Sequence, residues 1–161
     1  MKGLAMRLYH IGLQAFAVGE MCAAAVRPGS VLLVSAGPGF FSMVAALARE
    51  AQKAGAKVVA FTSVPAAELH VPADLVVQIP ATCLPAAAPG EMADACSTHH
   101  HVSVASSSSQ VEGTGRGSSA LPMGSSYELA LQLFCDVICR LLQRELGVSE
   151  ADMRQRHTNL E

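Results

Sequence analysis

Aromatic and charged side chains are scarce in this sequence of 161 residues. It contains no tryptophan, two tyrosines and five phenylalanines, and only 15% of its residues are charged. The net charge of −2 provides no excess of lysine and arginine for phosphate backbones, so nucleic acid is not an expected partner. Hydrophobic residues make up 51% of the chain, a composition that favours an α/β domain with much buried sheet and helix.

Long apolar runs and a disulfide framework are also missing. No stretch is apolar over the length of a bilayer, and polar residues interrupt the N-terminal segment too often for a signal peptide. The five cysteines are an odd number, which favours free thiols, a reducing compartment and a cytoplasmic location. Cys135 and Cys139 lie one helical turn apart, and we interpret them as small hydrophobic residues of a packed helix face rather than as metal ligands.

The strongest local signal is a strand, turn, helix and strand in residues 28–63. Residues 31–34 are a continuous apolar run, typical of a parallel strand buried on both faces, and residues 57–62 (KVVAFT) predict a second buried strand. Between them, apolar residues recur at helical spacing over residues 40–54. This pattern predicts a right-handed βαβ unit. Ligands of such sheets bind at the carboxyl ends of the strands, so we expect residues 35–42 to line the site.

The other elements are predicted from periodicity and from the glycines and prolines at their ends. We expect helices over residues 1–11, 121–146 and 149–155, and further strands over residues 13–19 and 75–79. Residues 81–120 are small and polar without an apolar period, which predicts a flexible loop rich in serine, glycine and proline. The sequence therefore predicts a single α/β domain, residues 1–161, with four visible strands.

The glycine turn after the first buried strand is a candidate phosphate site. Backbone N–H groups at a helix start and the helix dipole both favour an anion. The candidate ligands are the hydroxyls of Ser35 and Ser42 and the backbone at Gly37 and Gly39, whereas Pro38 has no N–H to donate. Glycines in this position are equally typical of a tight turn without a ligand, so the pattern alone leaves both interpretations open.

A few side chains are candidates for proton transfer or metal binding. Glu128, near the start of the long helix, could act as a base, and the alternative is a first-turn acid that faces solvent. His10 and His157 could move protons near neutral pH, although isolated histidines are more often structural. Cys96 with the histidines at 99–101 lacks the flanking turns that fix a zinc site, so we expect no metal.

Several blocks of the sequence, spread over nearly the whole chain outside residues 81–120, match one known family. They read AMRLYHIG, VLLVSAGPG, GAKVVAFTS, PMGSSYE and GVSEADMRQRHTNLE. Together they resemble the sugar isomerase (SIS) domain, and more narrowly its 6-phospho-3-hexuloisomerase branch. The first block and the terminal RHTNLE are fairly specific, whereas the AGPG turn alone would not be.

The resemblance implies an enzyme that interconverts 6-phospho-3-hexulose and fructose 6-phosphate without metal or other cofactor. It also implies a three-layer fold, a parallel sheet in flavodoxin-like order with helices on both faces, and a homotetramer with sites at subunit contacts. By the matching motifs, Glu128 would be the catalytic base and His157 the proton shuttle, in its own or a neighbouring subunit's site. His10 would line the sugar pocket.

The sequence departs from the family pattern in two places. Members commonly read Ser-Gly-Ser-Gly-Glu-Thr where this chain has AGPGFF at residues 36–41, so several phosphate-binding hydroxyls are replaced. Members also begin with a helix and a strand that this sequence lacks, so we expect an N-terminally incomplete domain. The alternatives to an isomerase are therefore a non-catalytic module that binds phosphosugars or self-associates, and an inactive fragment.

Overall fold

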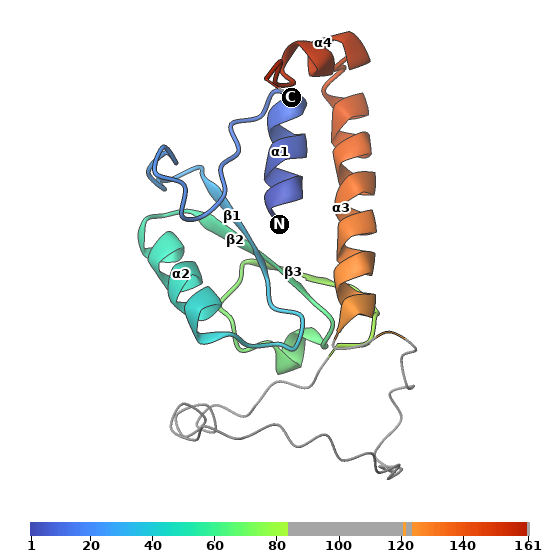
Figure 1. Ribbon diagram of the computed structural model, residues 1–161. Helices are drawn as coiled ribbons and strands as arrows, with labels where there is room; N and C mark the ends of the chain where they lie inside the picture. Colours follow the sequence, from blue (N-terminus) through green and yellow to red (C-terminus); the bar gives the residue numbers. More distant parts are fainter. Residues whose placement is uncertain (84–120, 122–123, 161) are drawn as a thin grey trace, which may run out of the picture.

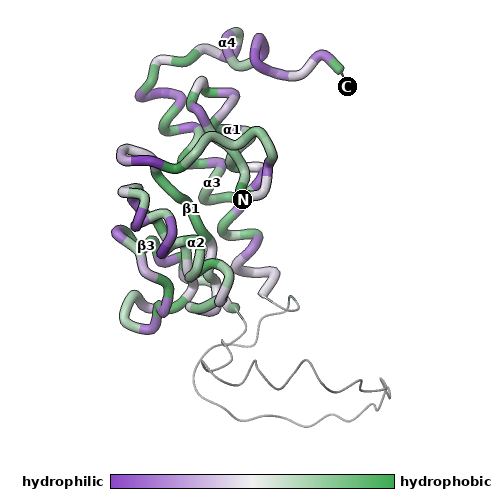
Figure 2. The backbone as a smooth tube through the Cα atoms, turned by 90° about the vertical axis from the view of Figure 1, so that its left-hand side faces the viewer, coloured by the Kyte–Doolittle hydropathy of each residue, from purple (hydrophilic) through white to green (hydrophobic). Residues whose placement is uncertain are grey.

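A parallel sheet of three strands lies at the centre of the computed structural model, which describes residues 1–83, 121 and 124–160 (Figure 1). The strands are β1 (Val31–Ser35), β2 (Lys57–Thr62) and β3 (Leu75–Gln78), in the order β1-β2-β3. In the middle strand, the successive residues Ala60 and Phe61 are both buried, on opposite faces of the sheet, which explains why its sequence is apolar without alternation. Figure 2 shows that β1 is likewise hydrophobic, whereas α4 (Glu150–Gln155) is largely hydrophilic.

Helices cover both faces of the sheet. Helix α2 (Ser42–Lys53) packs on one face, and α1 (Lys2–His10) and α3 (Ser125–Glu145) lie side by side on the other (Figure 1). A short 3-10 helix, η1 (Ala66–Glu68), follows β2. The expected α/β fold with a parallel sheet between helical layers is thereby confirmed.

Successive residues of the strands enter two separate apolar cores, because side chains alternate between the faces of a sheet. On the α2 side, the helix contributes three buried alanines, whose small size allows it to approach the sheet closely. On the α1 and α3 side the residues are larger, and the rings of Phe61 and Phe134 meet edge to face with centroids 6.0 Å apart. The buried members of this second core are Leu4, Phe61, Ile79, Tyr127, Leu131, Cys135 and Cys139.

The C-terminal helices end and begin as the sequence predicts. Gly147 follows α3 with φ of 65°, a left-handed conformation that glycine adopts without strain. Ser149 and Asp152 then form a capping box at the start of α4: Asp152 N donates to Ser149 Oγ, and Ser149 N donates to the Asp152 carboxylate.

Residues 13–19 do not form the predicted strand. The segment between α1 and β1 is irregular, and Leu13, Phe16 and Val18 are exposed. Its hydrogen bonds within the described residues are local, such as the one from Leu13 N to Leu8 O. A strand needs a neighbour for its N–H and C=O groups, and this segment pairs with no strand in the part of the chain that the structure describes. The prediction of four strands was therefore wrong for this region.

Two further expectations concern the loop and the membrane. From residue 84 onward, the loop predicted for residues 81–120 lies outside the described residues. Among the helices that are described, none combines the length and the apolar composition that a membrane span requires.

Asp74 joins the start of β3 to the start of β2. Its carboxylate accepts hydrogen bonds from Lys57 Nζ (2.7 Å) and Val58 N (2.9 Å), and Asp74 N donates to Val58 O (2.8 Å). The bond from Lys57, followed by the one from Val58, lowers the pKa of Asp74 from 3.8 to about 2. Because the pKa is lower in the folded chain, the stabilisation is complete above about pH 4 and is lost as the pH falls through about 2.

We expect Asp74→Asn to lower the melting temperature at neutral pH by a few degrees, because the amide cannot replace both charge-assisted bonds. The difference from the wild type should shrink as the pH is lowered from about 5 towards 3. Circular dichroism during heating measures both values. Glu50→Gln, which removes an exposed ion pair with Lys53, is the matched control and should change little. A difference that does not depend on pH would contradict this role of Asp74.

Candidate functional site

The glycine turn, residues 36–41, connects β1 to α2 at the carboxyl end of the sheet. Gly39 N donates to Ala36 O (2.8 Å) and closes the turn, and Gly39 has φ of 96°. The Gly37 carbonyl accepts hydrogen bonds from Ser63 N (3.0 Å), Ser63 Oγ (2.7 Å) and Thr62 Oγ1 (3.3 Å). The turn is therefore fixed against the end of β2 by side chains that the sequence analysis did not select.

The start of α2 provides donors for an anion next to this turn. The helix has 12 residues, and its N-cap residue Phe41 supplies no side-chain cap. The N–H groups of a first helical turn have no partners within the helix, and the positive end of the helix dipole lies there. Ser42 is exposed and Ser35 is half-buried, so both hydroxyls can add to the backbone donors. This geometry is consistent with the predicted phosphate site.

The first turn of α3 packs against the glycine turn through Tyr127. This side chain is only 4% exposed, and its hydroxyl lies 3.0 Å from Ser35 Oγ. Its ring lies on Gly37, since a Cβ atom there would be 2.8 Å from two ring carbons and 2.9 Å from Cys83 Sγ. Burial raises the pKa of Tyr127. Neither Tyr127 nor Cys83 was a candidate from the sequence. The one signal that could have pointed to Tyr127 is its position directly before Glu128.

Glu128 lies in the first turn of α3 and is exposed in this chain. Glu128 is therefore not buried among apolar neighbours. As the residue after Tyr127, it lies at the same edge of the sheet as the glycine turn. The structure thus brings Glu128 to the end of the molecule that holds Ser35, Gly37, Gly39 and Ser42.

His10 and His157 form a second group of predicted site residues. Their rings stack with centroids 5.1 Å apart and an angle of 28° between planes. Arg156 Nη1 donates to His10 O (3.2 Å) and so joins the segment after α4 to the end of α1. A cavity of about 520 Å³ adjoins the histidine pair. It is lined by Met6, Tyr9, His10, Gln155, Arg156, His157 and Thr158.

Within one chain, the two groups lie at opposite ends of α3. Glu128 is in the first turn of this helix, and the histidine pair lies where α1 ends and α4 follows α3 (Figure 1). Because α3 has 21 residues, it separates the two groups by about 30 Å. A single chain therefore does not unite the predicted base with the predicted proton shuttle.

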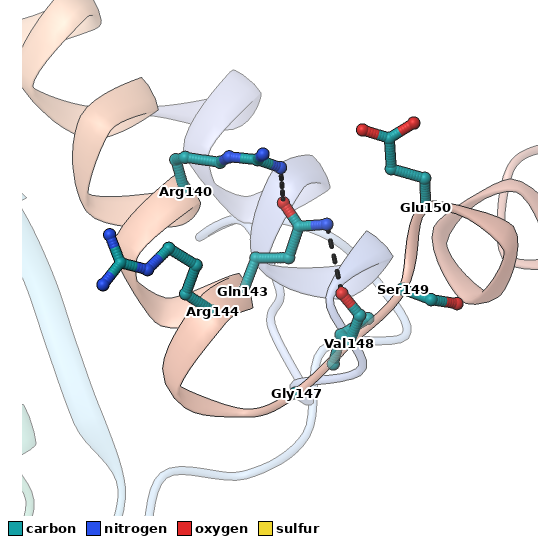
Figure 3. A pocket seen from close by; sticks show the side chains of 7 residues that line it. All are labelled: Arg140, Gln143, Arg144, Gly147, Val148, Ser149 and Glu150. Carbon is teal, nitrogen blue, oxygen red and sulfur yellow. Dashed lines mark hydrogen bonds between the residues drawn. The ribbon is translucent and has the colours of Figure 1, made fainter.

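A smaller cavity, of about 280 Å³, lies between the end of α3 and the start of α4 (Figure 3). Gln143 is 7% exposed there, accepts a hydrogen bond from Arg140 Nη1 (2.8 Å) and donates one to Val148 O (3.1 Å). Its amide is therefore satisfied and links the two helices, which is a structural role.

The cysteines of α3 behave as small hydrophobic residues, as predicted. Cys135 and Cys139 are buried in the second core, and burial raises the pKa of both thiols. Within the described residues, no group of three or more side chains is arranged to bind a metal. Cys96 and the histidines at 99–101 lie outside those residues.

We expect Gly37→Ala to destabilise the protein by about 1–3 kcal/mol, because the added methyl group would overlap the buried Tyr127 ring. Urea unfolding measures the loss. Gly3→Ala is the matched control: its methyl group would meet only the flexible Gln132 side chain at 3.8 Å, within a helix that favours alanine. If Gly37→Ala were as stable as the wild type, the result would contradict the close packing of Tyr127 on the turn.

No family model matches the chain, but several related proteins align with nearly its whole length. It is 26% identical to the 3-hexulose-6-phosphate isomerase of Bacillus subtilis, over 99% of this chain and 72% of that protein. It is 46% identical over 77 residues to the 3-hexulose-6-phosphate isomerase of Mycobacterium gastri, which is 48% of this chain and 39% of that protein. These relatives confirm the resemblance found in the sequence blocks.

A solved structure has the same fold. It is a hypothetical protein of Methanococcus jannaschii, for which a molecular function of 3-hexulose-6-phosphate isomerase was inferred. The TM-score is 0.71 at 21% identity, and the match covers 99% of this chain and 71% of the other. The likeness confirms the arrangement of sheet and helices.

Proposed function

We infer that this chain, which resembles the 6-phospho-3-hexuloisomerase-like branch of the SIS family, is a phosphosugar isomerase. We propose that it interconverts 6-phospho-3-hexulose and fructose 6-phosphate through an enediol, without metal or other cofactor. The main support for this proposal is the position of Glu128, which lies in the first turn of a helix that packs through Tyr127 on the glycine turn.

The proposed reaction moves a carbonyl group between neighbouring carbons of the sugar. A base removes the proton from the carbon that bears the hydroxyl, and the enediol then takes the proton back on the next carbon. A second group moves a proton between the two oxygens. In our proposal Glu128 is the base and His157 moves the oxygen-bound proton, while His10 lines the sugar pocket.

The glycine turn is the proposed anchor for the substrate phosphate. The N–H groups at the start of α2 and the hydroxyls of Ser35 and Ser42 would donate to its oxygens. A carbonyl oxygen directed at the phosphate would repel it. The carbonyl of Gly37 is instead engaged by Ser63 and Thr62, and this supports a turn whose donors remain for the anion.

A complete site of this kind needs two chains, because Glu128 and His157 lie at opposite ends of α3. We propose that the chain self-associates so that His157 of one copy reaches Glu128 of another. An exposed apolar stripe along α3, with one residue per helical turn, supports this contact. Its members are 45–68% exposed: Leu129, Leu133, Val137 and Leu141.

Turnover of purified full-length protein on 6-phospho-3-hexulose, coupled to detection of fructose 6-phosphate, tests the proposal. Formation of product that requires the protein supports an isomerase. Binding of the sugar phosphate without turnover would instead support a non-catalytic module. Failure to bind either sugar phosphate, together with the absence of a cooperative melting transition, would support an inactive fragment.

A further inference from the structure

A hydrogen bond between the side chains of Ser35 and Tyr127 links the sheet to the start of α3. Ser35 is the last residue of β1 and lies on the same face as Leu33, which packs in the core beneath α3. Its Oγ is 3.0 Å from the Tyr127 hydroxyl. The link therefore joins the strand that enters the glycine turn to the helix turn that carries Glu128.

Burial decides the direction of this hydrogen bond. Each hydroxyl has one hydrogen and can also accept, so either group could donate. In the part of the chain that the structure describes, Ser35 is the hydrogen-bond partner of the Tyr127 hydroxyl, and Tyr127 is 4% exposed. If Ser35 donated, the tyrosine hydrogen would be buried without an acceptor among those residues, which is costly. Donation by Tyr127 leaves the hydrogen of the half-buried Ser35 free to point elsewhere.

We infer that Tyr127 is a positioning residue for the anion site: it donates to Ser35 Oγ and thereby directs the Ser35 hydrogen toward a phosphate held at the glycine turn. The inference rests on the proposed function for the nature of the ligand. The Tyr127 ring also packs against Gly37 in the glycine turn, so the Tyr127 side chain contacts both the Ser35 hydroxyl and the backbone of Gly37.

The arrangement makes a specific prediction about two conservative variants. Tyr127→Phe keeps the ring on Gly37 but removes the donor, so Ser35 is free to turn toward other acceptors. We expect KM for the sugar phosphate to rise about 2- to 10-fold, which corresponds to the net free energy of one hydrogen bond. The change in kcat should be less than about 2-fold. Ser35→Ala should raise KM at least as much. The double variant should be no worse than Ser35→Ala, because Tyr127 acts through Ser35.

A purely structural role for Tyr127 would give a different result. It would lower the melting temperature and the fraction of active protein without raising KM, and its effect would add to that of Ser35→Ala. Ser30→Ala, directly before the opposite end of the same strand, is the matched control and should leave KM unchanged. Wild-type turnover with an unchanged KM in Tyr127→Phe, or additive effects in the double variant, would overturn the inference.

A second measurement keeps the inference testable if the wild type shows no turnover, which would count against the proposed function instead. Binding of inorganic phosphate is measured by calorimetry on the wild type, on both single variants and on the double variant. Weaker binding in Tyr127→Phe and in Ser35→Ala, without addition in the double variant, supports the positioning role. Equal affinity in all four proteins, or no binding of phosphate by the wild type, would overturn it.

Discussion

Replacing Glu128 by glutamine is expected to lower kcat by about 10²- to 10⁴-fold, the usual contribution of a general base. Glutamine has nearly the same shape, but its amide cannot take up the carbon-bound proton. Because Glu128 is exposed in the first turn of α3, the substitution leaves both apolar cores intact. The melting temperature should therefore fall only slightly, by the loss of a favourable charge near the helix start. Steady-state kinetics and thermal unfolding of the same preparation separate the two effects.

Glu50→Gln provides a matched control for this experiment. Glu50 is also an exposed glutamate of a helix, but it lies near the end of α2 and belongs to neither group of proposed site residues. Its replacement should leave kcat and KM unchanged. If Glu128→Gln kept the wild-type kcat, Glu128 would not be the base, while turnover by the wild type would still support an isomerase.

The elements that the sequence predicts correctly are those in which local signals agree. Over residues 28–63, apolar runs, helical spacing and glycines all specify the same strand, helix and strand, and the structure has them as β1, α2 and β2. The apolar residues of 13–19 also predict a strand. That prediction fails because a strand also depends on a paired neighbour, and a single segment carries no information on pairing.

The candidate site shows the same limit on a larger scale. Motif blocks identify Glu128, His10 and His157, but their grouping depends on helix length, and the 21 residues of α3 separate Glu128 from the two histidines. The bond between Ser35 and Tyr127 joins residues 92 positions apart and has no local signature. The three hydrogen bonds to the Gly37 carbonyl likewise come from distant residues, namely Thr62 at the end of the neighbouring strand and Ser63 directly after it. Tertiary contacts of this kind can be found only in the structure.

The separation of the two groups leads to the second large effect, which is recovery of activity when two impaired variants are mixed. Glu128→Gln and His157→Ala are each expected to be nearly inactive alone. In a two-fold symmetric pair, each site takes Glu128 from one chain and His157 from the other, so a mixed pair has one intact site. With random exchange half of the pairs are mixed, and about a quarter of the wild-type activity should return.

The recovery also depends on contact between chains, which a third change can remove. Leu133 is 68% exposed in the middle of the apolar stripe, so Leu133→Glu should not destabilise the single chain. It would place a charge in the proposed contact, and we expect it to abolish both self-association, measured by light scattering, and the recovery. Mixing Glu128→Gln with the double variant Glu128→Gln and His157→Ala should restore nothing, because no chain then supplies the carboxylate. If mixed assemblies form but remain inactive, His157 does not complete the site of a neighbouring chain, and the proton shuttle must be sought near the glycine turn.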